Sequence, residues 1–222
     1  MNESPKRFRA RVVRLQRLSS SGYELTFERN GLEFEAGRLV TIHGREPTED
    51  RSYTIASGEE DEHVQILFRH IATGKLTPEL INLRPGDFVE VSGPFGEFVV
   101  RDVAKPLVFV ATGTGVAPCR AYIRTHRDLD LTLIHGTRIA EDLFYRGEFQ
   151  TCRYFPCVSR ENGTGFHGRV TEFMKDFAID PEARFHLCGA NEMIFDMQVL
   201  LRRRGVDESR IFTEAYYYRL YS

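Results

Sequence analysis

The sequence predicts a β plus α/β fold, in which an N-terminal antiparallel β-barrel domain is followed by a parallel-sheet α/β domain. Apolar and polar residues alternate through the first hundred positions, as they do in half-buried strands. After residue 101, short apolar runs alternate with amphipathic helical stretches, which is typical of βαβ units. A length of 222 residues suits two domains of ordinary size. We therefore expect one domain at residues 1–101 and a second at residues 102–222.

The barrel half contains six segments that read as short strands, with one helical interruption. The strands are expected at residues 8–12, 23–27, 38–42, 51–56, 64–69 and 88–91. The helix is expected at residues 77–83, where Thr77 can cap its start and Pro78 fits its first turn. The acidic run at residues 59–62 is interpreted as a solvated hairpin tip.

The second half alternates buried strands with helices. Strands are expected at residues 107–111, 131–135, 154–158, 185–188 and 211–213, and helices at residues 117–127, 170–177 and 191–204. The first strand runs directly into Thr-Gly-Thr-Gly at residues 112–115, and Pro118 favours a helix start just beyond it.

Composition excludes several classes of function. A formal net charge of −2 gives no basic field of the kind that dominates nucleic-acid binding, so no nucleic-acid partner is expected. The longest apolar runs are too short to span a membrane, so no membrane insertion is expected. Without a secretory signal pattern, the four cysteines read as free thiols of a cytoplasmic protein. Cys152 and Cys157 have no further closely spaced ligands, so no metal site is expected.

The first group of residues that could bind a cofactor is Arg-Ser-Tyr-Thr at residues 51–54, near the end of a predicted strand in the barrel half. Arg51 and Tyr53 fall on one face of that strand, and Ser52 and Thr54 fall on the other. A planar guanidinium suits a phosphate, and an aromatic face suits a flat heterocycle. The alternative is an ordinary cross-strand arginine and tyrosine pair. A second segment, Gly-Lys-Leu-Thr at residues 74–77, combines a glycine turn with a helix start that can take a pyrophosphate, or is a simple helix cap.

A third constellation is the Gly-x-Gly of Gly113 and Gly115. It lies between a predicted strand and a predicted helix, at the first βα turn of its domain, where dinucleotides bind in open α/β sheets. Glycines at this turn permit close approach of the backbone to a pyrophosphate.

Together these segments resemble, in order and separation, the motifs of the ferredoxin-NADP reductase family over nearly the whole chain. They include Arg-x-Tyr-Thr at residues 51–54, Gly-Thr-Gly-Val-Ala-Pro at 113–118, His-Gly-Thr-Arg at 135–138, Ser-Arg-Glu-Asn at 159–162 and Cys-Gly at 188–189. The combination is closest to the short bacterial ferredoxin and flavodoxin reductases. The resemblance implies FAD in the barrel domain and NADPH or NADP+ in the α/β domain.

The resemblance also implies residue roles. Tyr53 would pack on the flavin, Thr54 would hydrogen-bond near its N5 atom, and Cys188 would border the nicotinamide; these three are the candidate catalytic residues. For Cys188, a small buried side chain without a chemical role is an equal alternative. The implied cofactor-binding residues are Arg51, Ser52, Tyr53, Thr54, Gly74, Lys75, Leu76, Thr77, Thr112, Gly113, Thr114, Gly115, Arg138, Ser159, Arg160, Arg169, Cys188, Gly189, Met193 and Tyr217. Tyr217 is a candidate for stacking on the flavin, although three tyrosines are adjacent at residues 216–218 and a plain aromatic contact is an equal alternative.

The function implied is hydride transfer from NADPH to FAD, followed by single-electron transfer to ferredoxin or flavodoxin, or the reverse. A reductase component for an oxygenase or for free flavin, and a non-catalytic nucleotide-binding subunit, are the alternatives. Basic residues along the first strand, or Arg202, Arg203 and Arg204, are candidates for steering an acidic partner, with solvated faces as the alternative. The sequence leaves the oligomeric state open.

Overall fold

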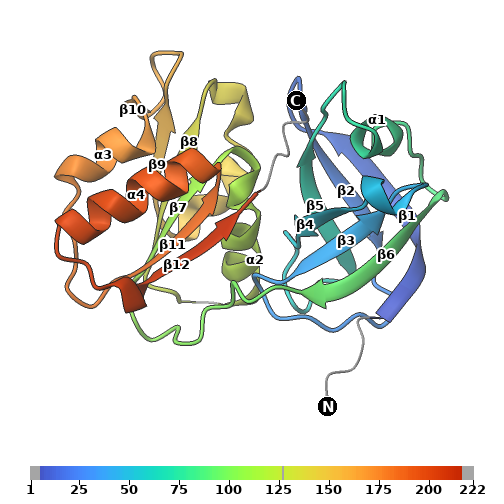
Figure 1. Cartoon of the computed structure of the whole chain (residues 1–222), viewed down its shortest axis with the longest axis horizontal. Coiled ribbons are helices and arrows are strands. Elements are labelled where there is room, and N and C mark those ends of the chain that lie inside the picture. The colour runs from blue at the N-terminus through green and yellow to red at the C-terminus, as the bar shows by residue number, and fades with distance from the viewer. Residues whose placement is uncertain (1–5, 127, 217–222) are drawn as a thin grey trace. The chain divides into compact units, whose positions relative to one another are not determined.

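The computed structural model describes residues 6–126 and 128–216, and its described residues divide into two compact units (Figure 1). One unit runs to Val100 and includes Ala117–Thr125, and the other comprises Arg101–Val116 and the chain from His126 onward. No helix within these described residues is long and apolar enough to cross a membrane.

Six strands of the first unit's described residues form one antiparallel sheet in the order β4-β3-β6-β1-β2-β5. Their bounds are β1 Lys6–Arg17, β2 Gly22–Glu28, β3 Leu39–His43, β4 Arg51–Thr54, β5 His63–Arg69 and β6 Phe88–Phe95. The two edges of the sheet meet beyond β4, where Ile55 bridges Ile66 and the Ala56 amide donates to Gln65 O at 2.7 Å. The sheet therefore closes on itself, and the predicted antiparallel barrel is confirmed.

The barrel interior is filled by alternate residues of these strands. Leu25 and Phe27 of β2 and Ile66 and Phe68 of β5 belong to one buried cluster. Because side chains alternate across a strand, the period of two seen in the sequence places this set inside and leaves charged residues outside.

Helix α1, Leu76–Leu80, begins one residue earlier than expected and without the predicted cap. Lys75 occupies the N-cap position, and Thr77 lies inside the helix, where only 8% of its surface is exposed. The Thr77 hydroxyl instead closes the preceding turn, because it accepts from the Ile71 amide at 3.0 Å and donates to Ile71 O at 3.2 Å. The capping role predicted for Thr77 is thus wrong, because Ile71 of the preceding turn takes the hydroxyl that a cap would use.

The second unit contains a parallel sheet, as predicted. Its described strands are ordered β10-β9-β8-β7-β11-β12. Their bounds are β7 Leu107–Thr112, β8 Leu131–Thr137, β9 Arg153–Val158, β10 Phe166–His167, β11 Arg184–Gly189 and β12 Ile211–Ala215. The order reverses between β7 and β11, which makes the carboxyl ends of these two strands the topological switch point. The two-residue strand β10 was not expected from the sequence.

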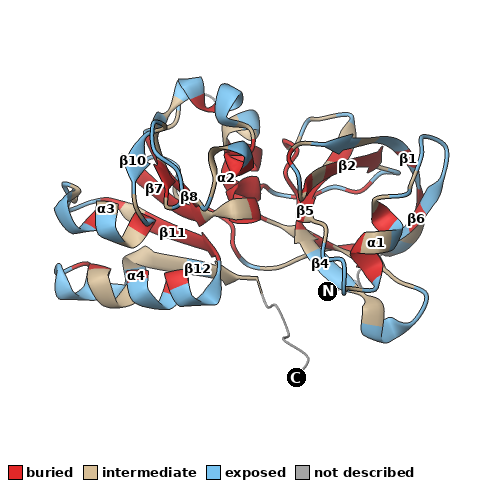
Figure 2. Cartoon of the chain, turned by 90° about the horizontal axis from the view of Figure 1, so that it is seen from above, coloured by how far each residue is buried: buried red, intermediate tan, exposed pale blue. Residues whose placement is uncertain are grey.

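Helices α3, Val170–Asp176, and α4, Asn191–Arg203, pack on each other and on this sheet (Figure 1). Buried and exposed residues alternate along α4 at helical spacing, with Met193, Met197 and Leu201 on its buried side (Figure 2). A short 3-10 helix at Arg146–Thr151 buries Phe149 against Tyr154 of β9.

Helix α2, Ala117–Thr125, belongs by its contacts to the barrel unit, although its residues follow β7 in the chain. The Tyr122 hydroxyl donates to Ala36 O at 2.8 Å and accepts from the Val100 amide. Arg124 forms a two-point ion pair with Asp61, at 2.7 and 3.0 Å. The acidic turn at residues 59–62 is therefore anchored rather than merely solvated, since Glu59 also accepts from the Ala36 amide at 2.7 Å.

Candidate functional site

The Arg51 motif lies on β4, at the edge of the barrel sheet that pairs with β3. Arg51 is exposed, and its Nη1 donates to the carbonyl oxygens of Thr48 at 3.0 Å and Asp50 at 2.7 Å. Ser52 lies opposite Thr41, with 3.0 Å between the two hydroxyl oxygens. Thr54 is buried. The guanidinium is thus tied at one nitrogen to the loop that precedes the strand.

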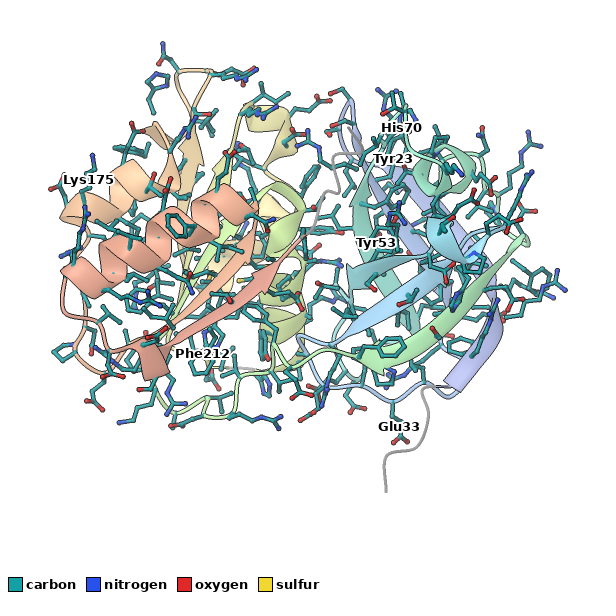
Figure 3. The ribbon with its side chains drawn as sticks, viewed as in Figure 1. Tyr23, Glu33, Tyr53, His70, Lys175 and Phe212 are labelled. Carbon is teal, nitrogen blue, oxygen red and sulfur yellow. The ribbon has the colours of Figure 1, made fainter. Side chains whose placement is uncertain are left out.

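Tyr53 projects from β4 with its ring half-buried against the barrel core (Figure 3). The edge of its ring contacts buried Phe68, with 6.2 Å between centroids and 65° between planes. Edge-to-face packing of this kind restricts a tyrosine ring to one orientation. The arrangement gives a partly exposed aromatic surface a fixed direction.

The loop before Arg51 is itself held by a partly buried set of polar side chains. His43 Nδ1 lies 2.7 Å from Asp50 Oδ2, and its Nε2 lies 2.9 Å from the Ser92 hydroxyl of β6. The other Asp50 oxygen accepts from the Gly44 amide at 3.1 Å. These bonds fix the residue whose carbonyl receives the Arg51 guanidinium, so the position of Arg51 depends on them.

The second predicted flavin segment lies against this same loop. Lys75 Nζ is 3.3 Å from Glu49 Oε1, and Arg45 Nε is 3.0 Å from Glu79 Oε1. Burial alone would raise the pKa of Glu49, but the hydrogen bond from Lys75 and bonds from backbone amides hold it below its usual value. The residues around Arg51 and those around Gly74, distant in the sequence, therefore form one local structure.

The side chains of this region fit a flavin dinucleotide. Arg51 and Lys75 place cationic groups on the exposed side of the loop and helix, and Tyr53 offers an aromatic face. Cationic donors suit phosphates, and an aromatic face suits an isoalloxazine ring. Since the Thr77 hydroxyl is engaged by Ile71, the donors left in the segment at residues 74–77 are Lys75 and backbone amides.

In the second unit, the predicted glycine turn meets the predicted Cys-Gly segment at the switch point. A Cβ added to Gly115 would lie 2.3 Å from Cys188 O, and one added to Gly189 would lie 2.3 Å from Thr112 Oγ1. The Ala190 amide donates to Thr112 Oγ1 at 3.0 Å. Two backbone segments thus touch without intervening side chains, which is possible only with glycine at both positions.

Cys188 is completely buried, with its thiol facing the neighbouring strand. Its Sγ is 4.0 Å from Glu214 Oε2, because Cys188 and Glu214 are register partners in the β11 and β12 ladder. Burial raises the pKa of the Cys188 thiol well above its ordinary value, and the Glu214 carboxylate raises it further against an opposing hydrogen bond from Tyr216. The sulfur therefore remains a thiol at neutral pH.

Glu214 and Tyr216 were not singled out from the sequence as site residues. Tyr216 reaches the same place through its amide, which donates to Gly189 O at 3.1 Å. Their closeness to Cys188 follows from parallel pairing of the last two strands, so an expected β11 and β12 ladder was the signal that could have identified them. Tyr217 lies outside the described residues.

Four predicted cofactor-binding residues lie just beyond the ends of neighbouring strands, at the same carboxyl edge of the sheet: Arg138, Ser159, Arg160 and Arg169. The Arg160 amide donates to Arg138 O at 2.9 Å, the Ser159 amide donates to Thr137 O at 3.1 Å, and the Gly168 amide donates to Val158 O at 3.0 Å. Arg138, Arg160 and Arg169 are all exposed. By contrast, Met193 is packed into the core beneath α4. The structure therefore places the arginines on exposed positions beyond the strand ends and Met193 in the core.

No group of three or more histidine, cysteine, aspartate or glutamate side chains in the described part of the chain is arranged to hold a metal ion.

Two sequence profiles match the chain and together cover most of it. The profile of the oxidoreductase FAD-binding domain matches residues 11–100, and that of the oxidoreductase NAD-binding domain matches residues 109–198. The chain belongs to the ferredoxin-NADP reductase family. Accordingly, it is a flavin oxidoreductase with domains for FAD and for a nicotinamide dinucleotide, and the predicted cofactors are confirmed at this level.

Relatives and solved structures agree with this assignment. A component of the Na(+)-translocating NADH-quinone reductase of Yersinia pestis is 28% identical over 200 residues, covering 76% of this chain and 49% of the relative. The chain thus spans about half the length of the curated relatives it matches. A cytochrome P450 reductase of Amycolatopsis is 26% identical, with a TM-score of 0.85 over 95% of this chain and 70% of that one.

A ferredoxin NADP+ reductase of Neisseria gonorrhoeae, solved with bound FAD and NADP, is 20% identical. Its TM-score is 0.85, over 96% of this chain and 99% of the other. This likeness shows that the two chains share their fold.

Proposed function

We propose that this chain transfers hydride from NADPH to FAD and passes single electrons to ferredoxin or flavodoxin, or runs the same steps in reverse. The observation that carries the proposal is the close glycine contact at the switch point, where Gly115 and Gly189 pack the glycine turn against the end of β11 at the place where a dinucleotide binds in such sheets. Residues 1–101 would serve FAD and residues 102–222 the nicotinamide dinucleotide.

When bound, FAD supplies the chemistry of accepting two electrons together and releasing them singly. The protein's part is to bind and orient. Arg51 and Lys75 would hold phosphates, Tyr53 would support the flavin ring, and Thr54 would donate a hydrogen bond to it. Cys188 would border the nicotinamide as a neutral thiol, with the Glu214 carboxylate behind it.

The decisive experiment measures cytochrome c reduction by the purified, flavin-loaded chain and NADPH, with and without ferredoxin or flavodoxin. We expect a yellow protein that bleaches with NADPH in the absence of oxygen, and acceptor-dependent turnover. Mass spectrometry of the released cofactor should identify FAD, and recovery of FMN alone would contradict the pyrophosphate site. A protein that neither binds flavin nor bleaches would be a non-catalytic nucleotide-binding subunit.

A second candidate is a reductase component that serves an oxygenase. The likeness to a cytochrome P450 reductase favours it, because that protein is 26% identical in sequence to this chain and shares its fold over 95% of this chain. Reduction of an oxygenase partner that exceeds reduction of ferredoxin and flavodoxin would select this alternative.

The basic first strand gives little support to charge-steered docking. Arg7 lies 3.7 Å from Glu90, Arg11 lies 3.9 Å from Glu28, and Arg14 lies 2.9 Å from Glu24. Near the end of α4, Arg204 Nη1 donates to the carbonyl oxygens of Met174 and Phe177, so it closes the end of α3. Neighbouring carboxylates and carbonyls thus satisfy much of this charge.

Replacing Tyr53 by alanine should weaken flavin binding far more than replacing Tyr23 does. Flavin stacking on an aromatic ring is worth about 1 to 3 kcal/mol by analogy with nucleobases, or roughly five- to 150-fold in the FAD dissociation constant. Tyr23 is a matched control, because it too packs on Phe68, with centroids 5.7 Å apart, and lies beside His70 (Figure 3). Flavin titration of both apoproteins measures the difference. Equal FAD affinity in the two variants would remove Tyr53 from the site.

Replacing Arg160 or Arg169 by alanine should lower kcat/KM for NADPH by roughly tenfold or more while leaving NADH unaffected. A charged hydrogen bond to a 2′-phosphate is worth about 1.5 to 3 kcal/mol, and NADH has no such phosphate. The Arg169 backbone amide keeps its bond to Glu172, so the start of α3 survives the substitution.

Arg153→Ala is the control for these two variants, because this arginine pairs with Asp130 at the amino end of β9, away from the carboxyl edge. Parallel losses with both cofactors would make Arg160 and Arg169 structural residues and would remove the NADP assignment.

A further inference from the structure

A histidine lies completely buried beneath the glycine turn of the second unit. His135 of β8 pairs with Ala111 of β7, just before that turn, and none of its surface is exposed. Its Nε2 lies 3.1 Å from the carbonyl oxygen of Gly113. Its Nδ1 lies 3.5 Å from the hydroxyl of Tyr154 on β9.

The partners of His135 define its tautomer. Burial lowers the pKa of His135 to about 4, against smaller upward contributions from its bond to Gly113 and from Asp142, so the ring is neutral at pH 7. A carbonyl oxygen can only accept, so Nε2 carries the proton and donates to Gly113 O. Nδ1 is then an acceptor, which suits the Tyr154 hydroxyl. The hydrogen bonds therefore run in one direction, from Tyr154 through His135 to the turn.

Gly113 begins a short 3-10 helix, Gly113–Val116, and the bond from His135 adds to the constraint on the direction of the peptide group between Gly113 and Thr114. Within the described residues, the cis peptide bond is the one between Gly93 and Pro94. The peptide bond between Gly113 and Thr114 is therefore trans. In a trans peptide the C=O and N–H point in opposite directions. With the Gly113 carbonyl turned toward His135, the Thr114 N–H points away from the imidazole. Gly113 has a φ of +53°, a conformation that ordinary residues rarely adopt.

We propose that His135 is a positioning residue for dinucleotide binding: by holding the Gly113 carbonyl inward, it directs the Thr114 amide toward the pyrophosphate. Without the bond, this peptide is held by the 3-10 helix alone, and any turn of its carbonyl oxygen toward the ligand would repel an anion. The inference rests on the proposed function, and it assigns a role to a side chain that would itself touch no ligand.

The test compares variants by calorimetric titration with NADP+ and with 2′-AMP, which carries the 2′-phosphate but no pyrophosphate. His135→Phe and His135→Leu remove the donor with different volumes, and His135→Gln restores an N–H near the Nε2 position. His186→Phe is the matched control, since His186 is also buried in this sheet but stacks between Phe109 and Phe212, each 4.9 Å from its ring.

Each donor-free variant that folds, His135→Phe or His135→Leu, is expected to bind NADP+ roughly three- to tenfold more weakly than the wild type. This is the effect of losing one neutral hydrogen bond. Their affinity for 2′-AMP should equal that of the wild type, KM for NADPH should rise at unchanged kcat, and the glutamine variant should recover most of the loss.

Unchanged NADP+ affinity, or equal losses of NADP+ and 2′-AMP affinity, would overturn the proposal. Failure of both donor-free variants to fold would also overturn it, because His135 would then be a structural residue. Wild-type protein that binds neither NADP+ nor NAD+ would instead overturn the proposed function.

Discussion

Replacing Gly115 by alanine is expected to abolish nicotinamide dinucleotide binding and to destabilise the second unit by about 3 kcal/mol, near the top of the usual range for overpacking. The added Cβ would lie 2.3 Å from Cys188 O, 2.6 Å from its carbonyl carbon and 2.8 Å from Gly189 Cα. All three are backbone atoms at the end of a central strand, so they cannot move aside as a flexible side chain can. The switch point must therefore open, and the dinucleotide site opens with it.

Gly147→Ala is the control for this prediction, because a Cβ at Gly147 meets no atom within 4 Å. Urea unfolding and NADP+ titration of both variants measure the two effects. A Gly115→Ala protein with wild-type stability and NADP+ affinity would show that the two strand ends separate at no cost, against the packing described above.

Replacing Arg120 by methionine is expected to destabilise the barrel unit by about 3 kcal/mol, the lower end of the range for breaking a buried ion pair. The Arg120 and Glu24 side chains are 6% and 2% exposed, with 3.5 Å between them. Arg120 Nη1 also donates to Ala56 O at 3.1 Å and to Gln65 Oε1 at 2.9 Å. Glu24 keeps bonds from Arg14 at 2.9 Å and from Gln65 Nε2 at 3.2 Å, and these remaining partners limit the loss.

Arg124→Met provides the comparison, since Arg124 lies one turn further along the same helix and pairs with Asp61, the two side chains being 36% and 27% exposed. It should cost about 1 kcal/mol or less, because water screens an exposed pair. The double variant Glu24→Gln with Arg120→Met should recover part of the loss, since it removes the stranded charge. Equal urea midpoints for the Arg120 and Arg124 variants would show that the Arg120 network contributes no more than a surface pair.

The sequence anticipated those parts of the site that lie on single segments. Arg51 and Tyr53 are two residues apart on one strand, and Gly113 and Gly115 belong to one turn, so local spacing proposed them and the order of the motifs along the chain, through the family resemblance, selected them. The sequence could not identify Glu214 as the neighbour of Cys188, because the two residues are 26 positions apart and meet only where β11 pairs with β12. Nor could it identify the role of His135, which depends on a carbonyl 22 residues away.

The sequence by itself determined the fold class, the order of the strands and helices, and the turns where cofactor motifs occur. These features follow from local periodicity and from the freedom of glycine, which each segment carries without reference to the rest of the chain. Tertiary structure decided which partners the polar groups find. It placed Arg120 of α2 in the barrel's polar network, and it brought Glu214 beside Cys188. A buried donor or acceptor must be satisfied by whatever group folding brings near, and that neighbour is set by the packing of distant segments.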